Sequence, residues 1–436
     1  MTAMRTCKVS WVLGSCSGLL LALGGAAACS AALPAQTGGD SAGADPGGDG
    51  PIRVSLSRGP TPIAGASVVS HDAEGAVLAT YTTNPSGEVD IPGAGVEMVT
   101  VIDGEQSQAY TVVGVKPGDH IVIPTFSVVE NLGTLDVTLP TPPTEAVRFH
   151  VFVGSDFNDA TTAGDAIAVA VTTADIGTQG SLTVLAMAQD ANYTIIAVST
   201  ATGVMPPAAG THQALATGAW TTAFNEFHLN VGGGGNIGSL QNTTSGQTVD
   251  GVHMDLPTRS GSMPYMWWNP VPSLGGYVDY STQIPYSAVS GAKRFWARRL
   301  AASATSDTID ITTLLPGLLA TSADTIDVAR PTLTWTASGS VDGADGVILN
   351  TRWNGWRWAF LLPTSQHSIR FPALPQSLAA WVPSAAVAQP YGVVVDTSYD
   401  ANYDDFRSDG LGLVSGPRFL HDAEGTLSGS VYFPAF

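Results

Sequence analysis

The chain contains few of the residues on which many exported and catalytic proteins depend. Its 436 residues include three cysteines, Cys7, Cys16 and Cys29, all close to the amino terminus. The rest of the sequence therefore offers no disulfide, no thiolate metal site and no cysteine nucleophile. Charged residues are also scarce, at 12% of the chain against about a quarter in average soluble domains. We therefore expect a surface of uncharged polar residues and a fold held together by buried apolar area.

Positive charge is especially scarce. The chain has 17 lysines and arginines against 36 aspartates and glutamates, which gives a net charge of −19 at pH 7. Phosphate backbones and anionic lipid head groups repel such a chain, so we expect no nucleic-acid partner. One basic run, from Lys293 to Arg299, is interpreted as a solvated stretch near the end of a strand. A patch that holds an anionic ligand is the alternative interpretation.

Several motifs of catalysis are missing from the sequence after Ile52. It contains no nucleophile elbow, no zinc-protease helix motif and no phosphate-binding loop. Eight histidines occur, and no two have the spacing that binds one metal ion from a single helix face. We therefore predict no catalytic residue and favour a non-catalytic protein. Because distant residues can converge in a fold, as catalytic triads do, enzyme activity stays open.

The amino terminus has the composition of an export signal. Arg5 and Lys8 precede an uncharged apolar run, and three alanines, residues 26–28, stand directly before Cys29. This segment resembles the signal peptide of bacterial lipoproteins, and the resemblance implies removal of residues 1–28 and attachment of a lipid to Cys29. The first of these alanines departs from the resemblance, because leucine is usual there. Ordinary cleavage that gives a soluble secreted protein is the alternative.

Residues 29–50 are predicted to form a flexible tether. Glycine, alanine, aspartate and proline dominate this segment and leave nothing with which to build a core. A lipid at its start would hold the protein on a membrane, and the tether would let the folded part stand away from it. We therefore expect an exported protein that is lipid-anchored to the bacterial cell envelope, with the outer membrane as the favoured location.

Strand patterns dominate the chain from residue 51 onward. Short runs rich in valine, isoleucine, threonine and aromatic residues recur between turns, as in 98–102 and 182–185. The 49 glycines and 28 prolines separate these runs and interrupt helices. The sequence therefore predicts an all-β fold of tandem antiparallel β-sandwich domains after the signal peptide and tether. The expected domains are residues 51–125, 126–235, 236–329 and 330–436.

Residues 51–125 carry the clearest family pattern. Pro62 to Val68, Thr83 to Val89 and Val99 to Val101 alternate turn residues with strand residues. This segment resembles a carboxypeptidase regulatory-like domain. The resemblance implies a small prealbumin-like sandwich that has no catalytic activity of its own.

Residues 330–436 resemble a fibronectin type III-like sandwich. Arg330 to Trp335 is similar to the second strand of that family with its core tryptophan, and Asp345 to Leu349 is similar to the next strand. Residues 126–329 carry no family motif that we recognise. The glycine run at 232–235 is taken as the boundary between two β-rich domains of about 100 residues each.

An acidic loop near the carboxyl end is the best metal candidate. Asp400, Asn402, Asp404 and Asp409 offer oxygen ligands, three of them at alternate positions, which suits a hard cation such as calcium. The loop lacks the central glycine and the final glutamate of a helix–loop–helix calcium site. We therefore expect no obligatory cofactor, with calcium as the cation that this loop would bind. A plain acidic loop is the alternative.

Aromatic residues form two groups that suit stacking on a sugar or a peptide. The groups are Tyr265, Trp267 and Trp268, and Trp353, Trp356 and Trp358. On a continuous strand, Trp356 and Trp358 would share one face and Trp353 would lie on the other. Filling of a sandwich core is the alternative role of these side chains.

Together these patterns predict a non-catalytic lipoprotein of the cell envelope that serves as a structural or ligand-binding surface module. Its expected partners are the membrane, through the lipid anchor, and a glycan or protein ligand. An exported carbohydrate-binding accessory protein or a hydrolase is the alternative. Exposed, coplanar tryptophans would favour sugar binding, whereas a buried histidine with carboxylate and hydroxyl neighbours in a cleft would favour the enzyme.

Overall fold

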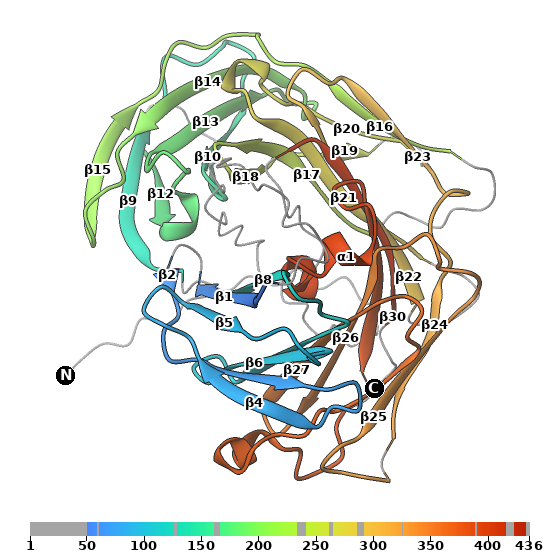
Figure 1. Ribbon diagram of the computed structural model, residues 1–436. Coiled ribbons are helices and arrows are strands. Elements are labelled where there is room, and N and C mark those ends of the chain that lie inside the picture. The colour runs from blue at the N-terminus through green and yellow to red at the C-terminus, as the bar shows by residue number, and fades with distance from the viewer. Residues whose placement is uncertain are drawn as a thin grey trace.

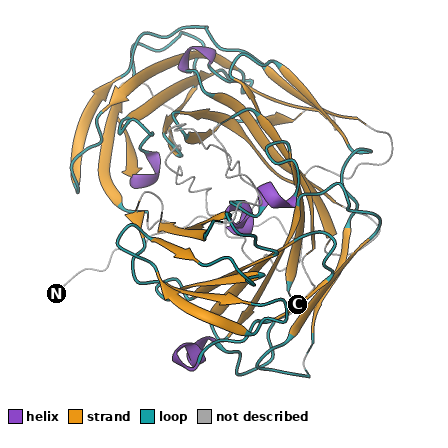
Figure 2. Cartoon of the chain, in the orientation of Figure 1, coloured by secondary structure: helices purple, strands orange, loops and turns teal. Residues whose placement is uncertain are grey.

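Strands and turns make up most of the computed structural model (Figure 1, Figure 2). The structure describes residues 50–58, 61–125, 129–160, 166–232, 241–260, 265–285, 292–324, 326–388, 390–415 and 423–432. Strands account for 53% of it and helices for 6%. The predicted all-β architecture with several sheets is therefore confirmed. The predicted signal peptide, Cys29 and nearly all of the tether lie outside the described residues.

One long sheet of twelve strands crosses the molecule (Figure 1). In order across the sheet, its strands are β18 (Val252–Asp255), β17 (Gln241–Val249), β21 (Tyr277–Pro285), β22 (Ala292–Ala301), β30 (Gly425–Tyr432), β29 (Tyr391–Thr397), β26 (Gly346–Trp353), β27 (Trp356–Leu362), β7 (Gln108–Val113), β6 (Met98–Asp103), β3 (Ser67–His71) and β4 (Val77–Thr82). Neighbouring strands are antiparallel except β27 and β7, which are parallel. Segments far apart in the sequence therefore share one hydrogen-bonded sheet.

The last of the described strands, β30, lies in the interior of this sheet. It pairs with β22 on one side and with β29 on the other, as the adjacent β22 and β30 ribbons in Figure 1 illustrate. Gly429 in the middle of β30 is opposite Phe295 of β22 and Val395 of β29. The final segment of the described chain thus joins two parts of the sheet.

A four-stranded sheet covers one face of the long sheet. Its strands are β2 (Thr61–Pro62), β1 (Ile52–Arg58), β5 (Glu88–Ile91) and β8 (His120–Thr125). Alternate residues of β1, namely Ile52, Val54 and Leu56, are buried, as expected for a strand with one face on a core. They belong to the same core as Tyr110 of β7 and Leu361 of β27. These two layers form a β-sandwich, while the carboxypeptidase regulatory-like assignment stays a prediction.

A second core lies on the opposite face of β27. Trp358 and Phe360 alternate with Leu361, so they point away from the first core. They pack with Trp335 and Phe371 under a three-stranded sheet. That sheet consists of β24 (Leu318–Ala323), β25 (Thr332–Ala337) and β28 (Ser368–Arg370). Because β27 is covered on both faces, its residues from 358 to 362 are all buried.

The remaining strands form three smaller sheets around two further cores. These sheets are β11 (Asp156–Ala160), β10 (Arg148–Val153), β13 (Leu182–Gln189) and β14 (Ile195–Val204); β12 (Ile167–Thr172), β9 (Asn131–Thr138) and β15 (Thr211–Ala216); and β19 (Arg259–Ser260), β20 (Tyr265–Trp268), β16 (Phe227–Gly232) and β23 (Ser306–Asp310). The helices are short: α1 (Tyr403–Phe406) and the 3-10 helices η1 (Thr173–Asp175), η2 (Pro272–Leu274), η3 (Gln376–Trp381) and η4 (Gly410–Ser415). None of the helices in the described residues is long and apolar enough to cross a membrane.

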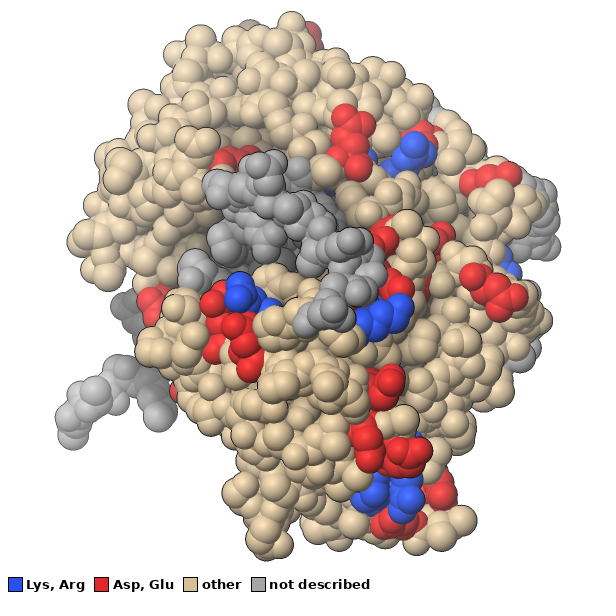
Figure 3. All heavy atoms as spheres, viewed as in Figure 1, with Lys and Arg blue, Asp and Glu red and all other residues tan. Residues whose placement is uncertain are grey.

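The visible surface agrees with the low charge content of the sequence. Figure 3 shows acidic and basic side chains in small groups on a face that is otherwise uncharged. Three of the expected domains, 51–125, 236–329 and 330–436, contribute strands to the long sheet. The domain boundaries and the fibronectin type III-like assignment stay predictions.

Candidate functional site

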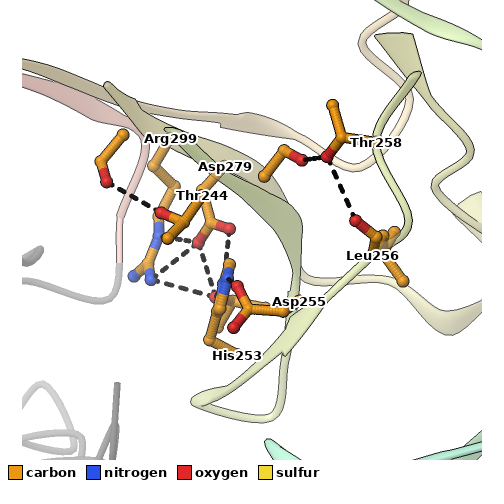
Figure 4. A network of polar contacts seen from close by, with 10 residues as sticks. Thr244, His253, Asp255, Leu256, Thr258, Asp279 and Arg299 are labelled. Carbon is orange, nitrogen blue, oxygen red and sulfur yellow. Dashed lines mark hydrogen bonds and ion pairs between the residues drawn. The ribbon is translucent and has the colours of Figure 1, made fainter. Parts of the chain in front are cut away.

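A network of polar side chains joins four neighbouring strands at one end of the long sheet (Figure 4). Its central members are Thr248 of β17, His253 of β18, Asp279 of β21 and Arg299 of β22. The turn Asp250–Gly251 has φ angles of 49° and 81°, which a two-residue hairpin turn requires and an Asp-Gly pair readily adopts. This turn places Thr248 directly opposite His253, and the next strands bring Asp279 opposite Arg299.

The Asp279 carboxylate is the centre of the network. Its Oδ1 lies 2.8 Å from Nδ1 of His253, and its Oδ2 accepts a hydrogen bond of 2.6 Å from the Thr248 hydroxyl. Nη2 of Arg299 lies 3.2 Å from the same Oδ2. The other ring nitrogen of His253, Nε2, lies 3.0 Å from Oδ1 of Asp255. The Asp279 side chain is 2% exposed, so its charge is balanced by these partners rather than by water.

These contacts set the charge state of the network. Burial by itself would lower the pKa of His253, but Asp279 and Asp255 outweigh this effect and raise the pKa to about 10. Burial would raise the pKa of Asp279, but His253 and Arg299 outweigh it and hold the pKa below its ordinary value. At neutral pH the network therefore consists of an imidazolium, a guanidinium and two carboxylates.

This charge state decides what the network does chemically. A hydroxyl, a histidine and an aspartate are the residue types of a catalytic triad, in which the histidine must accept the hydroxyl proton. Here both ring nitrogens of His253 carry protons, and Thr248 donates its own proton to Asp279. Oγ1 of Thr248 also lies 3.4 Å from Nδ1 of His253. A protonated His253 cannot take the Thr248 proton, so in this charge state the network ties neighbouring strands together.

The basic run at 293–299 is part of this region, on β22, and its charges are used within the protein. Nζ of Lys293 donates to Gln283, and Arg298 forms an ion pair of 2.7 Å with Asp307. Arg299 belongs to the Asp279 network. The run occupies most of β22, which lies between β21 and β30, so the prediction that it lies near the end of a strand is wrong. The anion-patch interpretation stays an alternative.

The residues of the predicted calcium loop lie in and around α1. Oδ1 of Asn402 accepts a hydrogen bond of 2.7 Å from the backbone N–H of Asp404 and so caps the helix. Asp404 forms ion pairs with Lys116 and Arg407. Cations of the protein therefore neutralise the carboxylate that the calcium prediction requires.

The other two members of that loop lie outside the helix. Asp400 accepts a hydrogen bond of 3.1 Å from the Thr397 hydroxyl, and the backbone carbonyl of Asp409 accepts from Gly412 at 2.7 Å. In the part of the chain that the structure describes, no group of three or more histidine, cysteine, aspartate or glutamate residues is arranged to hold a metal ion. Calcium binding at these positions stays a prediction.

Three of the six candidate aromatic residues are core residues. Trp268, Trp353 and Trp358 are 0%, 5% and 1% exposed. Trp268 packs on Phe227 with ring centroids 4.5 Å apart, and Trp358 packs on Phe371 at 4.7 Å. Side chains buried in this way have no free face for a ligand from solvent.

The remaining candidates include two partly exposed tryptophans. The guanidinium carbon of Arg259 lies 5.3 Å from the centroid of the Trp267 ring. The rings of Trp356 and Trp381 have centroids 4.0 Å apart, and both Trp267 and Trp356 are partly exposed. The side chain of Tyr265 is outside the described structure. Of the six, Trp267 and Trp356 are therefore the described side chains that solvent reaches.

The prediction that Trp353 faces away from Trp356 and Trp358 is wrong. Asn354 and Gly355 have φ angles of 44° and 85° and form a two-residue hairpin turn. Trp353 is therefore directly opposite Trp356, and directly opposed residues project from the same face of a sheet. The Asn-Gly pair between the tryptophans is the sequence signal that identifies this turn.

A second buried network was not predicted. The indole N–H of Trp358 donates to the Thr111 hydroxyl at 2.8 Å, Thr111 lies 2.9 Å from the Thr100 hydroxyl, and Thr100 lies 3.0 Å from Nε2 of His71. An indole N–H only donates, so the Thr111 hydroxyl accepts from Trp358, whereas the bonds from Thr111 to Thr100 and from Thr100 to His71 can run in either direction. The chain therefore ties His71 to the core through one ring nitrogen, Nε2. No local pattern links residues of β3 and β27.

The Asp279 network was not predicted either. Asp250–Gly251 is readable as a hairpin signal, whereas the approach of Asp279 and Arg299 depends on the order of strands in the sheet. In comparisons with known proteins, no family model matches the chain and no curated protein sequence matches it.

Proposed function

We propose that the chain is a non-catalytic lipoprotein of the bacterial cell envelope that serves as a structural or ligand-binding surface module. The observation that carries the non-catalytic part is the position of His253 between two carboxylates, one beside each ring nitrogen. This histidine has the neighbours of a catalytic base, yet Asp255 and Asp279 keep both of its nitrogens protonated at neutral pH. A general base must be able to accept a proton, so His253 supports the sheet and not a reaction.

The packing of the chain supports a structural role. The long sheet joins strands from the middle of the chain to late strands and these to early strands, and four apolar cores pack against the sheets. All three cysteines precede the first strand, so buried area and hydrogen bonds hold the fold. Such a body, attached through residues 29–50, suits a module that stands away from a membrane.

The proposed anchor is tested by replacing its cysteine. In a bacterial host with a lipoprotein pathway, Cys29→Ala should abolish incorporation of labelled fatty acid and move the protein from the membrane fraction to the soluble fraction. Cys16→Ala is the matched control, because Cys16 lies in the segment that would be removed. This control should leave both lipid labelling and membrane fractionation unchanged.

Two results would contradict the anchor. One is equal lipid labelling of the wild type and the Cys29→Ala variant. The other is a mass spectrum of the membrane-bound protein that retains residues 1–28, because the proposed maturation removes this segment and makes Cys29 the first residue.

A further inference from the structure

Two arginines face each other across the β26–β27 hairpin. Arg352 is directly opposite Arg357, one pair away from the turn. The N–H of Arg357 donates outward to Ser107, and the C=O of Arg352 accepts from Ala388 on the other side. The two arginines therefore form a non-hydrogen-bonded pair, in which Cα atoms approach to about 4.5 Å. Like charges in this position destabilise a sheet.

Among the residues that the structure describes, no acidic side chain pairs with either arginine of this hairpin. Within the described structure, neither Arg352 nor Arg357 forms an ion pair, although the chain has 36 acidic residues for 17 basic ones. Burial and the charge of Arg357 lower the pKa of Arg352, whereas Tyr391 acts in the opposite direction. Six of the other ten described arginines form an ion pair with a carboxylate. What distinguishes Arg352 and Arg357 is that they face each other across the hairpin without such a partner in the described part of the chain.

A buried amide lies beside the arginines. Asn350 is two residues before Arg352 and therefore projects from the same face of β26. It is 5% exposed, and its Nδ2 atom has no hydrogen-bond partner in the described structure. Asn350 is also directly opposite Tyr391 of β29. A buried donor without an acceptor is costly, so a ligand that supplies acceptor oxygens would be stabilised here.

We propose that this cluster, Asn350, Arg352, Arg357 and Tyr391, binds an oxyanion in the form of a phosphate or a carboxylate group. Guanidinium groups match both anions with paired, charge-assisted hydrogen bonds, and the Asn350 amide adds a further donor. Bound anion charge also removes the repulsion between the arginines. The site lies on the face of β26 and β27 opposite to the tryptophans. The oxyanion site does not depend on the proposed lipid anchor, so experiments can refute one of these two proposals and leave the other standing.

Calorimetric titration of the full-length chain in detergent tests the site. Inorganic phosphate and glucuronate are the two probes, each against sodium chloride of equal ionic strength. At least one probe should bind, and the stronger one identifies whether phosphate or carboxylate is preferred. In the double variant R352Q/R357Q the affinity should fall at least tenfold, and Asn350→Ala should weaken binding several-fold. Arg53→Gln, an exposed arginine already paired with Asp90, is the control and should bind like the wild type.

Stability measurements give an independent check. In buffer without either anion, R352Q/R357Q should unfold at a higher temperature than the wild type, because it lacks the repelling pair. Saturating anion should raise the unfolding temperature of the wild type and leave that of the double variant unchanged. The inference is overturned if neither probe binds, if the double variant binds as tightly as the wild type, or if it is less stable than the wild type without anion.

Discussion

His71 makes part of the stability of this protein depend on pH. Burial, helped by the charge of Arg330, lowers the pKa of His71 to about 4, whereas an exposed histidine titrates near 6.5. Between these values the unfolded chain binds a proton at His71 that the folded chain does not bind. The contribution of neutral, buried His71 to the free energy of unfolding is therefore fully present above pH 6.5 and is lost as the pH falls towards 4.

We expect this one residue to lower the free energy of unfolding by about 3 kcal/mol between pH 7 and pH 4. His71→Gln removes the titrating group and keeps an amide that can form a hydrogen bond with the Thr100 hydroxyl in either direction. Urea unfolding across this range should show a flatter pH profile for the variant than for the wild type. Parallel profiles would show that His71 does not titrate as its burial implies.

At the scale of elements, the β26–β27 turn fixes which side chains share a face. Gly355 has a φ of 85°, and a Cβ atom added there would meet nothing within 4 Å. Gly355→Ala should therefore lower the free energy of unfolding by about 1 kcal/mol through backbone strain alone. Gly104→Ala is the control, because that position is equally open and has no positive φ. If the Gly355→Ala and Gly104→Ala variants are equally stable in urea unfolding, backbone strain at residue 355 does not destabilise the protein.

Elements are also where the sequence was most informative. The alternation in β1 and the paired turn residues at 250–251 and 354–355 are local signals, because strand period and turn backbone depend on neighbouring residues. The pairing of β7 with β27 joins residues that are about 250 positions apart, and no local pattern encodes it. Whether Trp358 is a core residue or an exposed binding residue could therefore not be read from the sequence. Its ring is buried because sheets cover both faces of β27.

At the scale of the whole molecule, side chains from late segments hold early ones in place. The Arg407 guanidinium, which is almost fully buried, binds both carboxylate oxygens of Asp119 at 2.6 Å. The Tyr403 hydroxyl lies 2.6 Å from the carbonyl oxygen of Val113 and 3.0 Å from that of Leu361. These contacts join α1 to β7 and β27, so the two expected end domains share contacts beyond the sheet itself.

Gly429 tests how strongly the fold depends on the interior strand β30. A Cβ atom at this position would overlap the Phe295 ring and the backbone carbonyl of Val394. The backbone cannot shift without separating β30 from β29, so Gly429→Ala should lower the free energy of unfolding by about 1–3 kcal/mol or more. Gly104→Ala serves again as the open-space control in the same denaturant titration. Stability equal to that of the control would show that β30 is not tightly packed.

The position of β30 also has a consequence for folding. Until β30 docks, β22 and β29 have unpaired N–H and C=O groups along the edges that this one strand covers in the folded protein. Exposed strand edges of this kind recruit other chains and promote aggregation. A folding intermediate without β30 is therefore the species most prone to aggregate, and docking of β30 protects both edges at once.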